Sequence, residues 1–405
     1  MIYTLEMPYN QGLYIQWSDM LKSTGLEFNN LLLTNDSLEM KWDDFLSHKI
    51  NIDYINSHVT EEDTLLMDSY FISPLSDDND RRIKILSDSI NCKQIIIFHP
   101  DTGFSYHSAN GHNENPKVKI LTPIYNKDWD TEKMQNQYNF YLCNGAYQGL
   151  RWLSEMVFNR YKDMLRYKKF VSHNGVYKGH RTLLYDTLVQ NDLLKDTFFS
   201  YNAYNIFDTN VSGPEDVKRE TDYEYHMGEV LSDSNVGDLE KIYSRERHKE
   251  LLTELPIVLD YIPNLSNVDQ YAFTLPYTCN SYIEIIGCTA LHSSEEIYTS
   301  EKIFKPFMSF QIPIFIGQSG LVKTLKTLGF KMFDNVIDNS YDDIENNLER
   351  VQAVCEEIKR LGSLSREQIH NLYWDYEEEF KHNSRLMKEL FHKQRDNLIN
   401  LINGN

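Results

Sequence analysis

The feature that most constrains the fold is the alternation, in the first third of the chain, of short apolar runs with amphipathic segments. Leu13–Leu21 and Arg82–Ser89 have the apolar spacing of surface helices. Strand-like runs cover residues 1–7, 31–34, 64–68, 94–99 and 118–122. Because strands that alternate with helices usually pair in parallel, this part of the chain predicts an α/β unit.

A second series of the same kind follows a helix-compatible stretch, Tyr138–Arg166. Its strand-like runs are 168–173, 198–201, 282–287 and 312–317. Residues 340–405 have helical periodicity, with a break expected at Gly362. The predicted class is therefore α/β with C-terminal helices, in which two α/β units form a cleft and ligands bind beyond the carboxyl ends of their strands.

The length supports a division of the chain into domains. At 405 residues, it exceeds the size at which a single core usually stops growing. The expected boundaries are 1–160 for an N-terminal domain, 161–375 for a second domain and 376–405 for a C-terminal helix that packs back across both. Asp208–Ser234, rich in acidic residues, Ser and Gly, is expected to be a solvated surface loop whose removal leaves the fold intact.

Charge and terminal sequence narrow the range of partners. A formal charge of −20 disfavours long-range attraction to nucleic acids or anionic membranes. The first residues lack a secretory signal pattern, and no run of about 18 apolar residues occurs, which predicts a cytoplasmic protein, or one in the host cytoplasm if the chain is viral. Five widely spaced cysteines without a CxxC pair indicate buried thiols rather than disulfides or zinc ligands.

One candidate ligand-binding segment is "RYKKFVSHNGVYKGHR", residues 166–181. An apolar strand leads through Asn174 and two glycines into a helix that begins near His180. Arg181 and the first helical amides would face the strand ends, an arrangement that suits a phosphate or diphosphate. The alternative is a loop-to-helix turn whose arginine forms a surface ion pair. Neither a GxGxxG nor a GxxxxGK[ST] pattern is present, which disfavours dinucleotide-binding and P-loop folds.

A second candidate is "TSEKIFKPFMSFQIPIFIG", residues 299–317. Thr299 or Ser300 can cap a helix, and Pro306 cannot donate to the carbonyl of Lys302, so the backbone there is expected to be irregular. Glu301 would then bind a ribose and Lys302 a phosphate of a nucleotide. The alternative is an exposed ion pair between Glu301 and Lys305, four residues apart.

These two segments resemble the donor-site signature of α1,3-fucosyltransferases and of related glycosyltransferases from phages, large viruses and bacteria. The resemblance extends over about 168–383 and includes "SEKIFKPF", Glu349–Arg350 and His382–Asn383. It implies a GT-B fold, in which two Rossmann-like domains face a cleft and the C-terminal one holds a nucleotide-sugar donor. It further implies that Arg181 binds the donor diphosphate, Glu301 the ribose and Lys302 a phosphate, with Asn174 shaping the pocket.

The acceptor hydroxyl needs a general base, which the N-terminal domain would supply. His99 ends the strand-like run 94–99, Asp101 follows it two residues later, and Asp68 ends the run 64–68. The nearest approach to a DxD motif, "DDND" at 77–80, has the composition of a solvated turn. No metal site is therefore assigned, and no cofactor is obligatory. A metal is not required, because Arg, Lys and helix dipoles can stabilise a leaving diphosphate alone, and a divalent cation stays compatible with the donor site.

The leading hypothesis is a glycosyltransferase that moves a sugar from a nucleotide diphosphate sugar to a hydroxyl of a glycan or small molecule, with inversion. A phage-type DNA glycosyltransferase acting on a hydroxymethylated base is the first alternative. Its acceptor is less compatible with a chain of −20 charge, which has few cations outside 160–181 and 323–331. The second alternative is a non-catalytic relative that binds nucleotide sugars or glycans.

Overall fold

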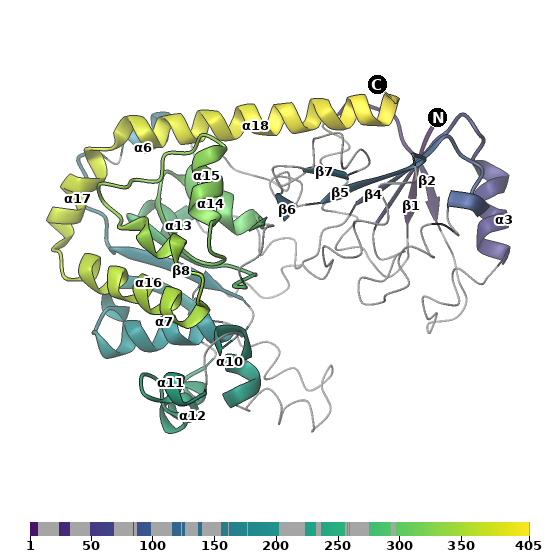
Figure 1. Cartoon of the computed structure of the whole chain (residues 1–405). Helices are drawn as coiled ribbons and strands as arrows, with labels where there is room; N and C mark the ends of the chain where they lie inside the picture. Colours follow the sequence, from purple (N-terminus) through teal and green to yellow (C-terminus); the bar gives the residue numbers. More distant parts are fainter. Residues whose placement is uncertain are drawn as a thin grey trace.

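The chain is an α/β protein built on two separate parallel sheets, seen in a computed structural model (Figure 1). The description applies to residues 1–6, 24–32, 49–68, 84, 87–98, 116–122, 124–125, 137–139, 155–160, 162–175, 177–201, 223–231, 236–255, 257, 259, 275–292 and 297–404. Within these ranges, the predicted α/β class with two parallel sheets and C-terminal helices is confirmed.

The N-terminal sheet has the strand order β2-β1-β3-β4-β5-β7, with every neighbouring pair parallel. Its strands are β1 (Ile2–Glu6), β2 (Asn29–Leu32), β3 (Thr64–Asp68), β4 (Gln94–Phe98), β5 (Val118–Thr122) and β7 (Gln137–Asn139). The inner strands are nearly continuous apolar runs, as expected for strands buried on both faces. The strand order reverses between β1 and β3, so the topological switch point lies there.

The second sheet has the order β12-β10-β8-β9 and is also parallel throughout. Its strands are β8 (Phe170–Asn174), β9 (Thr197–Tyr201), β10 (Ile283–Gly287) and β12 (Ile312–Ile316). All residues of β10 and β12 are buried, because helices cover both faces of the sheet. The order reverses between β8 and β10, which places the switch point of this sheet at Asn174 and Gly287.

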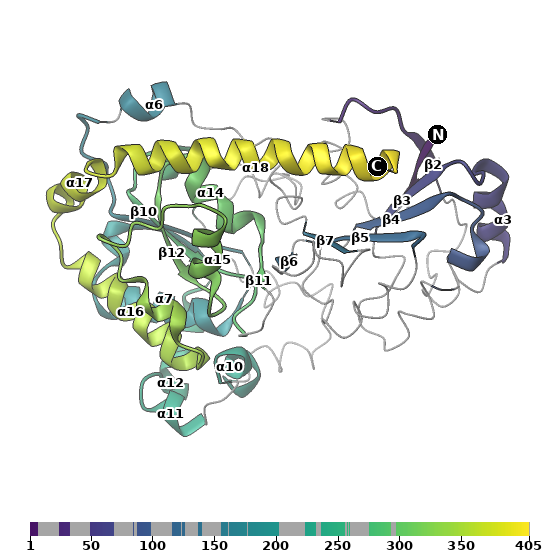
Figure 2. The ribbon, with the colours of Figure 1, turned by 45° about the horizontal axis from the view of Figure 1, so that its top comes forward.

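Helices flank the second sheet on both sides. In Figures 1 and 2, α7 and α16 lie on one side of it, and α14 with the long α18 on the other. The helices are α3 (Lys49–His58), α6 (Glu155–Arg160), α7 (Gly179–Gln190), α10 (Tyr223–Leu231), α11 (Val236–Glu240), α12 (Arg245–Thr253), α13 (Leu275–Cys279), α14 (Glu301–Ser309), α15 (Leu321–Thr327), α16 (Asn347–Gly362), α17 (Arg366–Trp374) and α18 (Glu377–Asn403).

Two connections join the part of the chain around one sheet to the part around the other. The short strands β6 (Ile124–Tyr125) and β11 (Ile297–Tyr298) pair in antiparallel fashion. Helix α18 begins beside α14 and ends on the N-terminal sheet, where Leu398, Leu401 and Ile402 pack against residues of β3, β4 and β5 (Figure 2). The Gln94 amide donates to the carbonyls of Leu401 and Ile402 at 3.0 and 2.8 Å, which helps to satisfy acceptors in the last turn of the helix.

Two expectations from the sequence are wrong. The stretch expected to be helical from Tyr138 onward begins in strand β7, and its described helix, α6, has only six residues. The segment Asp208–Ser234 contains α10, whose Tyr223, Met227 and Val230 are buried in the main core. These apolar residues recur at helical spacing and pack against α7, so the segment cannot be a solvated loop throughout. The domain boundaries at 160 and 375 stay predictions.

Candidate functional site

The candidate site lies beyond the carboxyl ends of β8 and β10, at the switch point of the second sheet. In open parallel sheets, adjacent strands that run their connections to opposite faces leave a crevice there for a ligand. Asn174 ends β8, Gly287 ends β10, and α7 begins shortly after β8 at Gly179. The helix start expected near His180 is thus confirmed.

The amide of Asn174 is held in one orientation. Its Nδ2 donates to Ser172 Oγ at 3.0 Å and to the Ser200 carbonyl at 3.3 Å. Ser172 Oγ in turn donates to the Ile285 carbonyl, so it can only accept from Asn174. The other amide atom, Oδ1, is buried without a hydrogen-bond partner. Asn174 therefore presents a fixed acceptor at the strand end, suited to a hydroxyl or N–H donor.

Arg181 is buried and binds the end of β10. Its Nη2 donates to the carbonyls of Gly287 at 2.8 Å and Cys288 at 3.3 Å, and its Nε to Gly287 at 3.2 Å. A Cβ on Gly287 would lie 2.8 Å from both Arg181 Cγ and Asn174 Oδ1, so only glycine admits this approach. The guanidinium thus shapes the strand end directly, and whether it also binds a diphosphate stays a prediction.

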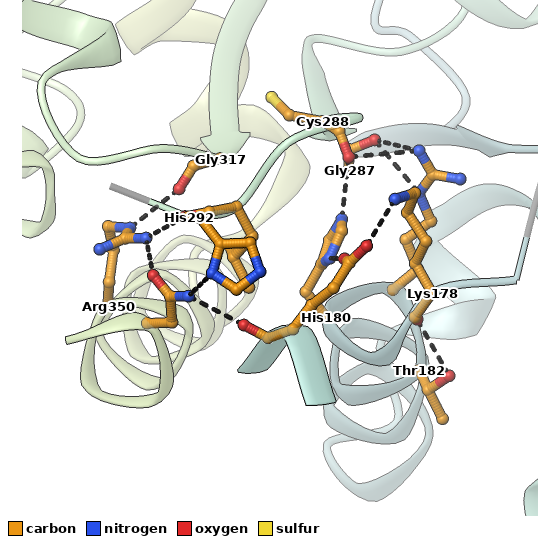
Figure 3. A network of polar contacts seen from close by, with 12 residues as sticks. Lys178, His180, Thr182, Gly287, Cys288, His292, Gly317 and Arg350 are labelled. Atoms are coloured by element: carbon orange, nitrogen blue, oxygen red, sulfur yellow. Dashed lines mark hydrogen bonds and ion pairs between the residues drawn. The ribbon is translucent and has the colours of Figure 1, made fainter. Parts of the chain in front are cut away.

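Lys178, His180 and Glu229 form a polar cluster between the start of α7 and α10, in which Figure 3 labels Lys178 and His180. Lys178 Nζ lies 2.8 Å from Glu229 Oε1, and His180 Nε2 lies 3.0 Å from the Cys288 carbonyl. His180 Nδ1 faces Glu229 Oε2 at 3.6 Å. Burial lowers the pKa of His180 to about 4. For Glu229, burial acts the other way, but the Lys178 ammonium, 2.8 Å from the carboxylate, helps to hold the pKa below its usual range.

Arg350 fastens the end of β12 to the same network. Its side chain donates to the carbonyls of Gly317 and Leu291 at 2.8 and 2.5 Å and to Asn347 Oδ1 at 2.5 Å (Figure 3). Asn347 Nδ2 donates to the Glu229 carbonyl at 2.8 Å. Burial lowers the pKa of Arg350 to about 10, which leaves it charged at neutral pH. Arg350 of the Glu349–Arg350 pair is therefore a buried residue that donates to backbone carbonyls.

The N-terminus of α14 carries the second sequence motif. Ser300 is the N-cap residue, and its buried Oγ has no hydrogen-bond partner. The cations Arg181 and Lys302 both act on the thiol of Cys288, although burial dominates and raises its pKa to about 12. Lys302 and Arg181 thus belong to one region. The helix continues through Pro306, so the expected backbone irregularity beside Lys302 is not seen. The side chain of Glu301 lies outside the described parts.

The candidate catalytic residues are placed only in part. Asp68 is the last residue of β3, adjacent to the switch point of the N-terminal sheet, but its side chain is not described. His99, Asp101 and the "DDND" segment lie outside the described residues. The roles assigned to Asp68, His99, Asp101, Asn174, Arg181, Glu301 and Lys302 stay predictions.

The basic residues between 160 and 181 do not form an open patch. Arg166 donates to the Tyr373 hydroxyl, Lys169 pairs with Asp196, and Lys178 pairs with Glu229. Arg166, Lys169 and Arg181 are all buried. Of the other basic residues, Arg160 and Lys162 are exposed and Lys168 is partly buried, so the solvent-facing charge is confined to the start of the segment.

Metal-ligating groups, thiols and membrane-spanning helices are described here for the ranges given above. Within them, no group of three or more His, Cys, Asp or Glu side chains could hold a metal ion. Cys92, Cys279, Cys288 and Cys355 are buried thiols, as expected, and Cys143 lies outside these ranges. None of the helices described is both long and apolar enough to cross a bilayer.

The sequence reasoning missed Glu229 and the part that His180 plays. Glu229 lies in the segment that was predicted to be a surface loop because of its acidic composition. The spacing of Tyr223, Met227 and Val230 is the signal that could have revealed a helix there. Those positions predict a helix with one buried face, on which a neighbouring carboxylate would be partly buried.

Comparisons with known proteins find weak structural similarity. No family model and no curated protein matches the chain. One similar solved structure is described as "Trehalose-6-phosphate from E. coli bound with UDP-2-fluoro glucose", with TM-score 0.44, 10% identity, and coverage of 97% of this chain and 98% of that one. Another is the Candida albicans trehalose-6-phosphate phosphatase N-terminal domain, with TM-score 0.37, 11% identity, and coverage of 97% and 89%. At this level, neither similarity indicates a function.

Proposed function

We propose that the chain is a glycosyltransferase that transfers a sugar from a nucleotide diphosphate sugar to an acceptor hydroxyl. The observation that carries the proposal is the switch point of the second sheet, where Asn174, Arg181 and Gly287 meet and where Arg181 binds the Cys288 carbonyl. Lys302, in the first turn of α14, lies close enough to Cys288 to oppose the rise in the pKa of its thiol. Cations and helix N-termini at such a point suit a diphosphate. The resemblance of these motifs to fucosyltransferase-like enzymes agrees with it.

In the proposed donor complex, Lys302 and the N-terminus of α14 bind the diphosphate. Arg181 adds positive charge while holding the Gly287 and Cys288 carbonyls in place. Glu301 accepts from the ribose hydroxyls. Asn174 Oδ1 and Ser300 Oγ are buried without hydrogen-bond partners. In the complex, Asn174 Oδ1 accepts a hydrogen bond from the ligand, and the Ser300 hydroxyl donates one to it or accepts one from it. A ligand with both anionic and hydroxyl groups would satisfy all these atoms together.

The proposed reaction is a displacement at the anomeric carbon. A carboxylate of the N-terminal part, Asp68 or Asp101, takes the proton of the acceptor hydroxyl. The hydroxyl oxygen bonds to the anomeric carbon as the bond from that carbon to the diphosphate oxygen breaks. The nucleoside diphosphate leaves with the electron pair, and Arg181 and Lys302 stabilise its charge. Attack on the face opposite the leaving group inverts the anomeric centre.

Titration calorimetry with GDP, UDP, ADP and CMP, with and without a divalent cation, tests the donor site. We expect selective binding of one nucleoside diphosphate, weakened in Lys302→Ala by roughly 1 to 3 kcal/mol, the loss of one charge-assisted hydrogen bond. Lys249→Ala, which removes an exposed lysine from α12, is the matched control and should bind normally. Equal affinity in Lys302→Ala and the control would show that Lys302 is no ligand.

A second experiment separates a transferase from a protein that only binds the donor. In Asp68→Asn, we expect nucleotide affinity to be kept and the release of nucleoside diphosphate from a sugar donor to be lost. If the unchanged protein releases none from any donor that it binds, the chain is a binding protein and the proposed reaction is wrong.

A further inference from the structure

Two hydrogen-bond acceptors, one on His180 and one on Glu229, face each other without a hydrogen between them. The Cys288 carbonyl can only accept, so the Nε2 of His180, 3.0 Å away, must carry a hydrogen and donate it. The neutral ring then has only a lone pair at Nδ1. That lone pair faces Glu229 Oε2 at 3.6 Å, and both atoms are buried without a hydrogen-bond partner. Two acceptors thus face each other, and one added proton would satisfy both.

The charges around the pair explain why it does not bind this proton at neutral pH when no ligand is present. Glu229 on α10 is already paired with Lys178, and Arg181 follows His180 on α7. The Cys288 carbonyl, just after β10, faces the His180 ring. Asn347 of α16 donates to the Glu229 backbone carbonyl and contacts His292. A proton on His180 would be a third positive charge beside one carboxylate. At neutral pH, the ring is therefore neutral and the carboxylate ionised.

We propose that the His180–Glu229 pair takes up a proton when a nucleoside diphosphate binds at the adjoining strand ends, which makes donor binding tighter at lower pH. The inference rests on the proposed function, since it assigns a regulation to the same site. An anion beside Arg181 and Lys302 lowers the cost of positive charge on the ring. The protonated ring then donates to both the Cys288 carbonyl and Glu229, and so fixes the carbonyl that Arg181 also binds.

The size of the effect follows from Coulomb attraction. One negative charge about 5 Å from the ring, at an effective dielectric constant of about 20, raises the pKa of the ring by about two pH units. Starting from a pKa of about 4, the bound state would carry about half a proton at pH 6 and below about a tenth at pH 7.5. By linkage, nucleotide affinity should fall over the same interval.

Glu229→Gln is the informative variant. Its amide oxygen can accept from Lys178, while its N–H₂ can donate to the neutral Nδ1, so the facing acceptors disappear with little change in shape. Calorimetry at pH 6 in two buffers of different ionisation enthalpy gives the protons taken up with the tightest-binding nucleotide among GDP, UDP and ADP. We expect about half a proton more in the unchanged protein than in Glu229→Gln. The difference cancels the titration of the nucleotide phosphates.

The outcomes separate the two proposals. Nucleotide binding with the same proton count in both proteins overturns the inference and leaves the proposed function standing. Absence of nucleotide binding at both pH 6 and pH 7.5 removes the proposed function and the inference with it. If Glu229→Gln does not fold, NMR of ¹³C-labelled histidine rings in the unchanged protein replaces it, with His180 assigned through His180→Gln. A ring pKa that nucleotide leaves unchanged would refute the inference.

Discussion

Replacing Gly287 by alanine tests the packing at the centre of the candidate site. The backbone of Gly287 does not require glycine, because its φ is not among the positive values. Space is the obstacle: the new Cβ would lie 2.8 Å from Arg181 Cγ, 2.8 Å from Asn174 Oδ1 and 3.0 Å from Arg181 Nε. Carbon atoms normally approach no closer than about 3.5 Å, so Arg181 or Asn174 must move by several tenths of an ångström.

The cost can be estimated from what Arg181 would lose. Overpacking of a buried position by one methyl group costs roughly 1 to 3 kcal/mol. A guanidinium pushed from the Gly287 and Cys288 carbonyls weakens hydrogen bonds that are worth roughly 1.5 to 3 kcal/mol each when a charged group takes part. Allowing for partial relaxation, we expect local stability around β8 and β10 to fall by about 3 kcal/mol.

Hydrogen exchange of peptides that cover β8 and β10 measures this loss locally, which suits a chain with two sheets that need not unfold together. Gly175→Ala is the matched control, because a Cβ at Gly175 would meet nothing within 4 Å. We expect its exchange to match that of the unchanged protein. Exchange in Gly287→Ala that is equally slow would refute the close approach of Arg181 and Asn174.

Two further predictions concern pH. Burial raises the pKa of Glu284, in the middle of β10, to about 7, with Lys305 opposing the rise, so the folded protein loses stability as pH rises from about 4.5 to 7. Glu284→Gln should therefore raise the melting temperature at pH 8, by the equivalent of about 3 kcal/mol, and leave it unchanged near pH 4.5; an equal gain at both pH values would contradict this. Burial lowers the pKa of His248, between the hydroxyls of Tyr177 and Tyr243, to about 4, so its contribution is present above pH 6.5 and lost as pH falls toward 4. As pH falls over that interval, the free energy of unfolding of His248→Phe should drop by up to about 3 kcal/mol less than that of the unchanged protein. His392→Phe, at an exposed position, should lose as much stability in acid as the unchanged protein does.

The fold was predictable where the pattern was local. The runs at 64–68 and 118–122 coincide with β3 and β5, and the break at Gly362 coincides with the end of α16. These features were predictable because residues close together in sequence determine them. Helix α10 was missed because composition outweighed its three apolar positions. Residue spacing also could not show that Arg181 turns toward the Gly287 carbonyl, or that Glu229 meets His180, since both depend on chain segments distant in sequence.

The β6–β11 pair gives the two halves of the chain a mechanical linkage. β11 belongs by sequence to the second half, yet it hydrogen-bonds to β6, which follows the N-terminal strand β5. Tyr298 is the last residue of β11, and the N-cap of α14 follows two residues later. The proposed donor site at the start of α14 is thus two residues away from a strand that pairs with the part of the protein expected to hold the acceptor. A displacement of the N-terminus of α14 would therefore be passed to β6 through the β6–β11 hydrogen bonds, and a displacement of β6 would be passed back.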